Sequence, residues 1–134
     1  MSRADERVAI LLFAHGSRVE EANQGVRELA REVERQGPYT YVRPAFLELG
    51  APNLATAVYE AAEAGFRRVI IIPYFLTLGL HLRRDLPSLV EAEKQKFPDL
   101  ELVVGQPLEG HALMASLILE RIQDATGGPS PRHS

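Results

Sequence analysis

The sequence predicts an α/β fold, in which a four-stranded parallel sheet carries helices on both faces and so forms three layers. Short apolar runs, such as VAILLFA at residues 8–14 and RVIIIPY at residues 68–74, alternate with longer segments of helical apolar spacing. A continuous apolar run is typical of a parallel strand that is buried on both faces. Regular alternation of strands and helices favours right-handed crossovers within one sheet. We therefore expect a single domain over residues 1–125.

Local signals support the individual elements. Ser17 precedes the first helix at capping-box spacing from Glu20. Pro44 leaves the second strand imperfect, because proline donates no hydrogen bond to a neighbouring strand. Asp85 is expected to cap the third helix, with Pro87 in its first turn. In chain order we expect strand 8–14, helix 17–36, strand 39–47, helix 53–64, strand 68–74, loop 75–84, helix 85–97, strand 100–104, helix 110–125 and a disordered tail over 126–134.

The composition excludes several classes of function. The chain has 134 residues, 46% hydrophobic and 25% charged, which suits one globular core. It contains no cysteine, and this excludes disulfides, thiolate zinc sites, iron–sulfur clusters and a cysteine nucleophile. A net charge of −3 argues against a general nucleic-acid partner. Because neither a membrane span nor a signal peptide is visible, we expect a soluble cytoplasmic protein.

Polar residues gather just after the predicted strands. In open α/β sheets, ligands bind beyond the carboxyl ends of the strands, and parallel strands all end at the same edge. The sequence therefore predicts that residues from several separate segments converge there. These residues are His15, Ser17 and Arg18 after the first strand, Glu48 after the second, and His81, Arg83, Arg84 and Asp85 beyond the third. His111 follows the fourth strand and is expected to be a structural residue in the first turn of the next helix.

His15 and His81 are the candidate metal ligands at this edge. Neutral imidazoles bind divalent cobalt, nickel, iron and zinc, and two of them make an open site suited to a metal that is handed on. Metal-free interpretations also stand: His15 as a general base or turn residue, and His81 as a solvated loop residue. Glu48 is a metal ligand, a proton acceptor or a surface carboxylate at a strand end.

Arg18, Arg83 and Arg84 are candidate anion-binding residues, because guanidinium groups bind carboxylates and phosphates in bidentate fashion. Helix N-termini do not favour arginine, so these positions favour an anionic ligand over simple solvated charge. The chain has no GxxxxGK[ST] phosphate loop, no GxGxxG after the first strand and no GxSxG elbow. A hydrolase that uses Ser17, His81 and Asp85 remains open on the residues alone.

An ordered set of motifs resembles that of a known family. Residues 12–18 read LFAHGSR, residues 45–49 read AFLEL, and residues 73–76 read PYFL and lead to GLHLRRDLP at residues 79–87. Together these motifs resemble the small CbiX-type sirohydrochlorin chelatases of the class II chelatase family, over residues 8–122. The resemblance implies a single chelatase-like lobe with a flavodoxin-like three-layer sandwich.

The resemblance also implies an activity, the ATP-independent insertion of a divalent metal into sirohydrochlorin in cobalamin or siroheme biosynthesis. Cobalt is the first expectation, with iron and nickel as alternatives, and the metal is a substrate rather than a permanently bound cofactor. His15 and His81 match the two metal-binding histidines of the family, and Glu48 matches its acidic residue. The alternative is a metal or tetrapyrrole carrier that shows no turnover.

A flat, carboxylate-bearing macrocycle needs apolar contacts for the ring and cations at the rim. We expect substrate contacts from Ser17, Arg18, Leu80, Arg83 and Arg84, with further apolar contacts from Leu76, Leu78 and Leu82. Larger class II chelatases have two lobes around a cleft, whereas this chain resembles one lobe. The prediction is therefore a twofold homodimer whose facing strand ends form the cleft.

Overall fold

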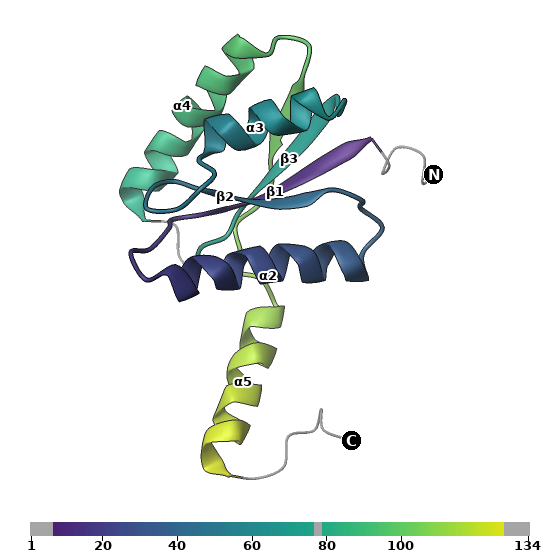
Figure 1. Cartoon of the computed structure of the whole chain (residues 1–134). Helices are drawn as coiled ribbons and strands as arrows, with labels where there is room; N and C mark the ends of the chain where they lie inside the picture. Colours follow the sequence, from purple (N-terminus) through teal and green to yellow (C-terminus); the bar gives the residue numbers. More distant parts are fainter. Residues whose placement is uncertain (1–6, 77–78, 128–134) are drawn as a thin grey trace.

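A computed structural model of the chain describes residues 7–76 and 79–127 and confirms the predicted four-stranded parallel sheet (Figure 1). The strands lie in the order β2-β1-β3-β4, and every neighbouring pair is parallel. Their carboxyl ends therefore share one edge of the sheet. The elements are β1 (Val8–Ala14), α2 (Glu20–Gln36), β2 (Val42–Phe46), α3 (Leu54–Glu63), β3 (Arg68–Pro73), α4 (Leu80–Lys96), β4 (Glu101–Val104) and α5 (Leu113–Thr126).

The position of each strand in the sheet follows from its residues. β1 is an interior strand between β2 and β3, and all of its residues are buried, as its unbroken apolar run predicts. β2 is an edge strand, and its Pro44 lies opposite Leu12 of β1. An edge strand tolerates a proline because only one of its sides must pair. Strand β2 is accordingly shorter than the predicted range of 39–47.

Helices cover both faces of the sheet, as predicted. α3 and α4 pack on one face over a core that includes Leu11, Phe13 and Ile71. α2 lies on the opposite face (Figure 1), where Ala30 shares a buried cluster with Ile10. The fold is therefore a three-layer α/β sandwich whose carboxyl edge lies open between the layers.

Helix α5 forms where a helix was predicted, although it begins at Leu113 rather than at residue 110, and it does not cover the sheet. It extends away from the body of the molecule (Figure 1), and none of its residues is buried. Its large apolar side chains are 46% to 68% exposed; these are Leu113, Leu117, Ile118, Leu119 and Ile122. The helix ends at Thr126, beyond the expected boundary at residue 125, and Gly127 follows in a left-handed conformation.

The face of the sheet that carries α2 is covered only in part. Beside α2 an apolar groove of about 460 Å³ lies over β1 and β3. Its lining residues are Ile10, Leu12, Leu29, Val33, Tyr39, Ile70, Ile72, Tyr74 and Leu108. An apolar groove of this kind and an uncovered apolar helix are both unfavourable in water.

The predicted start of α2 is wrong. The helix begins at Glu20, and its N-cap is Val19, which makes no side-chain capping bond. The hydroxyl of Ser17 instead accepts a hydrogen bond from the backbone N–H of Val19 at 3.0 Å, so that Ser17 forms a turn before the helix. The carboxylate of Glu20 accepts a hydrogen bond from Arg27 rather than closing a capping box.

The predicted start of α4 is also wrong. The helix begins at Leu80, ahead of Asp85, so His81 lies in its first turn and not in a loop. Pro87 consequently lies inside the helix. The physical reason is that Leu82 extends the helical apolar spacing of Leu86 and Val90 upstream of Asp85 and packs against the same core. This burial outweighs the hydrogen bond that the proline removes.

Two predictions concern residues at the margins of the structure. The single-domain boundary at residue 125 stays a prediction, and residues 128–134 of the expected tail lie outside the described residues. Across the ranges that the structure describes, no helix has both the length and the apolar character that a membrane span requires.

Candidate functional site

The structure brings His15 and Glu48 together at the carboxyl edge, as predicted. His15 directly follows β1, and Glu48 follows β2, which is the neighbour of β1 in the sheet. The His15 Nε2 atom lies 3.6 Å from the Glu48 Oε2 atom, and each side chain is 57% exposed. The two groups form an ion pair when the imidazole is protonated, and both remain accessible to a ligand.

The backbones of the two strand-end loops approach each other closely. The Leu47 N–H donates a hydrogen bond to the carbonyl of Ala14. At the next residue along each loop, the Glu48 N–H donates to the carbonyl of His15 at 3.0 Å. Gly16 has a φ of 96°, and a Cβ atom at this position would lie 1.6 Å from the carbonyl oxygen of Glu48. Only glycine fits there, for both conformational and steric reasons.

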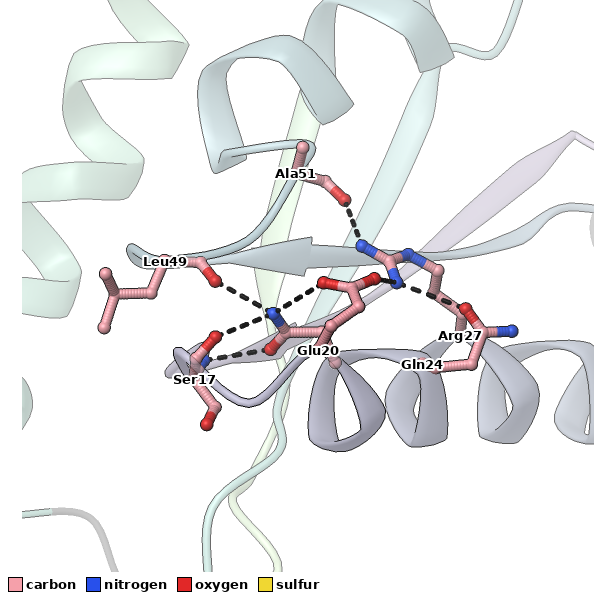
Figure 2. Close-up of polar contacts among 7 residues, drawn as sticks. Ser17, Glu20, Gln24, Arg27, Leu49 and Ala51 are labelled. Atoms are coloured by element: carbon pink, nitrogen blue, oxygen red, sulfur yellow. Dashed lines mark hydrogen bonds and ion pairs between the residues drawn. The ribbon is translucent and has the colours of Figure 1, made fainter.

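Asn23 of α2 joins the same two loops through its side chain (Figure 2). It is only 2% exposed. Its Oδ1 accepts from the Ser17 N–H at 2.9 Å, and its Nδ2 donates to the carbonyls of Ser17 at 2.8 Å and Leu49 at 2.9 Å. An unpaired buried amide would cost roughly 1–3 kcal/mol, so these bonds account for a polar residue on the buried stripe of α2.

Arg27, one turn further along α2, extends this network to the surface (Figure 2). It donates to the Glu20 carboxylate at 2.6 Å and to the Ala51 carbonyl at 3.2 Å. The Arg27 hydrogen bond, assisted by one from Asn23, holds the pKa of Glu20 below its ordinary value of 4.5. The network thus fastens the start of α2 to the loop that carries Glu48.

A hollow of about 400 Å³ lies between the end of β1 and helix α4. Its lining residues are His15, Leu47, Leu82, Asp85, Ser88 and Leu89. Asp85 was expected both as the cap of a helix and among the residues at the carboxyl edge, and the structure places it in the same hollow as His15. Leu82 also lines the hollow, as expected of an apolar contact. Ser88 and Leu89 lie within the predicted helix 85–97, but no motif in the sequence marked them as site residues.

The remaining predicted residues lie in the loop before α2, in the segment after β3 and along α4. Leu80 and Leu76 are exposed, and so are Arg18 and Arg84. Arg83 contacts the loop after β4 through Glu109, at 3.2 Å. The backbone of His81 lies in the first turn of α4, while its side chain and Leu78 fall outside the described residues.

His111 has a local structural role. Its Nδ1 accepts a hydrogen bond from the backbone N–H of Leu113 at 3.0 Å, so the imidazole caps the first turn of α5. In the ranges 7–76 and 79–127, no group of three or more His, Asp or Glu side chains is arranged to hold a metal ion. The described part of the site therefore offers an imidazole and a carboxylate with open coordination positions.

The His15–Glu48 pair is suited to binding a cation and to accepting a proton. A neutral imidazole and a carboxylate bind divalent cations, and two ligands leave most of the coordination sphere to other donors. The same groups accept protons from an acid held against them. The edge is suited to a cation that is received and released, rather than to one held permanently.

The fold and the site define a parallel α/β protein with an open imidazole–carboxylate pair at the carboxyl edge of its sheet. Comparison with known proteins gives the family. The CbiX family model matches residues 9–125, and the chain belongs to the CbiX family.

Three relatives illustrate the range of this similarity. A sirohydrochlorin cobaltochelatase from Methanopyrus kandleri is 31% identical over 140 residues, which is 90% of this chain and 98% of the relative. A chloroplastic sirohydrochlorin ferrochelatase from Arabidopsis thaliana is 32% identical over 114 residues, covering 85% of this chain and 51% of the relative. The crystal structure of a CbiX protein of cobalamin biosynthesis from Marinobacter aquaeolei VT8 matches with a TM-score of 0.80 at 24% identity, covering 90% of this chain and 98% of that one.

Proposed function

We propose that this protein inserts a divalent metal ion into sirohydrochlorin without ATP. The observation that carries the proposal is the exposed His15–Glu48 pair, 3.6 Å apart, at the carboxyl edge of a CbiX-family chain. Similar proteins are named sirohydrochlorin cobaltochelatase and sirohydrochlorin ferrochelatase, which supports this substrate. The metal is a substrate, and the proposal includes no permanently bound cofactor.

The proposed metal ligands are His15 and His81, and Glu48 accepts a proton or contributes a third donor. The position of His81 in the first turn of α4 supports its part, since α4 lines one side of the hollow that His15 enters. Insertion requires the inner pyrrole N–H groups of the ring to lose their protons as the metal enters. Glu48, an accessible carboxylate beside the metal ligand, is the proposed acceptor.

The macrocycle is proposed to lie against the carboxyl edge. Its carboxylates would pair with arginines whose side chains are exposed there, and its ring would contact exposed leucines. The proposed substrate contacts are Ser17, Arg18, Leu80, Arg83 and Arg84.

A homodimer is proposed to supply the second wall of the cleft. The uncovered apolar side chains of α5 and the apolar groove beside α2 support a second copy, because each is the complement of the other. We infer that α5 of each copy covers the groove of its partner. Glu109, held by Arg83, lies in the connection to α5 and favours the outward direction of the helix.

The activity is tested by mixing purified protein with sirohydrochlorin and Co²⁺, Fe²⁺ or Ni²⁺ and following the visible spectrum of the ring. We expect insertion above the protein-free rate with at least one metal, and a large loss of that rate in His15→Ala. Arg67→Ala is the matched control, since Arg67 is exposed at the opposite edge of the sheet. Rates equal to the protein-free control with all three metals contradict the proposal.

The same experiment separates the alternatives. A carrier would bind metal or tetrapyrrole in a saturable manner without turnover. A Ser17-dependent hydrolase would lose ester cleavage in Ser17→Ala and would not bind the ring. Competition among the three metals ranks Co²⁺, the metal we propose first, against Fe²⁺ and Ni²⁺, and so assigns the protein to cobalamin or siroheme biosynthesis. A cytoplasmic location remains our prediction.

A further inference from the structure

We propose that Asn23 is a positioning residue for His15 and Glu48. This inference rests on the proposed function, because it concerns how the metal-binding pair is held in place. Asn23 touches neither side chain. Its effect would pass through Ser17 and Leu49, which lie two residues after His15 and directly after Glu48.

The hydrogen bonds of Asn23 join two loops that no single secondary-structure element connects. One loop follows β1, the other follows β2, and Asn23 lies in α2 between these strands in the sequence. Its two N–H groups reach one carbonyl in each loop, Ser17 at 2.8 Å and Leu49 at 2.9 Å, while its oxygen binds the Ser17 N–H. Removal of the Nδ2 group would therefore disconnect the loops from each other at this point.

The geometry at Leu49 and Gly16 explains why such a bridge is needed. Leu49 has a φ of 58°, which is unfavourable for a residue with a side chain. The hydrogen bond from Asn23 to its carbonyl compensates for part of this strain and fixes the turn that presents Glu48. Since Gly16 leaves no room between the loops, a small displacement at either one changes the distance from His15 Nε2 to Glu48 Oε2.

The burial of Asn23 makes this role distinct from ordinary helix capping. An Asn that only closed a helix end would leave the Leu49 carbonyl to solvent. Here the amide is 2% exposed and bonds to both loops, with a longer contact of 3.4 Å to the Glu20 carboxylate. Residues that orient metal ligands without binding the metal matter for function: their removal typically lowers metal affinity or activity by about tenfold to a hundredfold.

The test uses two substitutions with different chemistry. Asn23→Ala removes all the bonds of the amide. Asn23→Asp keeps the shape and the acceptor for the Ser17 N–H but loses both N–H donors. We expect each to lower the affinity for Co²⁺ alone, measured by calorimetry, and kcat/KM for insertion by about tenfold or more. If the alanine variant does not fold, the aspartate variant carries the measurement.

Two controls separate positioning from a general loss of stability. Val69→Ala removes buried volume near the amino end of β3, at the edge remote from His15, and we expect Co²⁺ affinity within about twofold of the original protein. In the His15→Ala background, Asn23→Asp should cause no additional loss of Co²⁺ affinity, because the group it positions is gone.

The outcomes are distinct for the two proposals. If the original protein binds Co²⁺ through His15 but inserts no metal, the proposed function fails while the affinity of the Asn23 variants still tests positioning. The inference is overturned if the folded Asn23 variants match Val69→Ala in both affinity and kcat/KM, or if their losses are additive with His15→Ala. It is also overturned if neither binding nor insertion by the original protein depends on His15.

Discussion

Helices α2 and α5 are both amphipathic, and the topology offers both of them the same face of the sheet, yet only α2 is packed. α2 buries Asn23, Val26 and Ala30, whereas the chain that the structure describes leaves every residue of α5 unburied. The apolar groove beside α2 marks the place on the sheet that remains uncovered.

The difference shows that contacts within the same chain are enough to bury α2, whereas burial of α5 requires a second chain. α2 is connected to a strand at both ends, so the parallel crossover from β1 to β2 holds it against the sheet. Among residues 7–76 and 79–127, which the structure describes, α5 follows β4, and no described strand follows α5 to hold it against the sheet. Its apolar side chains therefore depend on another surface, for which the proposed partner is a second copy.

The largest effect is expected from charges placed on α5. Ile118→Asp combined with Ile122→Asp should convert the proposed dimer to a monomer, measured by sedimentation velocity at micromolar concentration. Each buried isoleucine contributes roughly 1.5–3 kcal/mol, so the loss in both copies weakens association by more than about a thousandfold. Ser116→Asp, on the opposite side of the helix, is the control and should leave the dimer intact. If the original protein is a monomer, the proposed burial of α5 by a second copy is contradicted.

A separate experiment tests whether α5 of one copy lies in the groove of the other. The chain contains no native cysteine, so only the introduced cysteines can form a disulfide. One preparation carries Ile118→Cys in α5, and a second carries Ile70→Cys in the groove. After mixing and oxidation, we expect a disulfide-linked heterodimer on a non-reducing gel. A helix that folds back on its own chain would give no such product beyond the level of a control pair with Ser116→Cys.

A moderate effect is expected within α2. Val26→Ala removes two methyl groups from the cluster that includes Phe46 and should lower the free energy of unfolding by roughly 1–2 kcal/mol, measured by urea titration. The oligomeric state should remain that of the original protein, since Val26 faces the chain's own core. A change of assembly in this variant would show that α2 and α5 are not independent.

A smaller effect is expected at the connection to α5. Glu109→Gln weakens the contact with Arg83, which is an exposed pair, so the free energy of unfolding should change by less than about 1 kcal/mol. The measurement of interest is the dissociation constant of the dimer from dilution series. We expect a weaker dimer, because this contact is proposed to direct α5 outward, and an unchanged dissociation constant would contradict that role.

The smallest effect is expected at Glu20, at the start of α2. Its pKa is lowered in the folded protein, chiefly by the Arg27 hydrogen bond. The carboxylate therefore contributes stability above the ordinary value of 4.5, and this contribution is lost as the pH falls through the lowered folded pKa. Glu20→Gln should be less stable than the original protein near neutral pH, and the difference in urea midpoint should shrink as the pH falls through the lowered folded pKa of Glu20.

The sequence was sufficient for the fold because the strands are unusually clear. The unbroken apolar run of β1 and the strand–helix alternation define a parallel sheet, and the common direction of its strands then determines which residues share an edge. The start of α4 was misjudged because Pro87 and Asp85 resemble a helix start, whereas burial of Leu82 extends the helix backwards. Local signals of this kind are weaker than packing over several turns.

For the site, topology predicted that His15 and Glu48 lie at the same edge of the sheet, and the structure added their contact. The contribution of Asn23 was missed because it depends on contacts with loops that are distant in the sequence. One signal was present: a polar residue at i, i+3 and i+7 spacing with Val26 and Ala30 must find buried partners. The uncovered state of α5 had no signal at all, since its apolar spacing fits a partner chain as well as its own sheet.

The close approach at Gly16 has a consequence for how this protein tolerates sequence change. In a library that samples every amino acid along the loop after β1, substitutions at His15 should yield folded but inactive protein. Substitutions at Gly16 should instead deplete folded protein itself, although this residue has no chemical group to contribute. Measuring both abundance and activity for every variant would thus distinguish His15 from Gly16, whereas measuring activity alone would show the same loss at both positions.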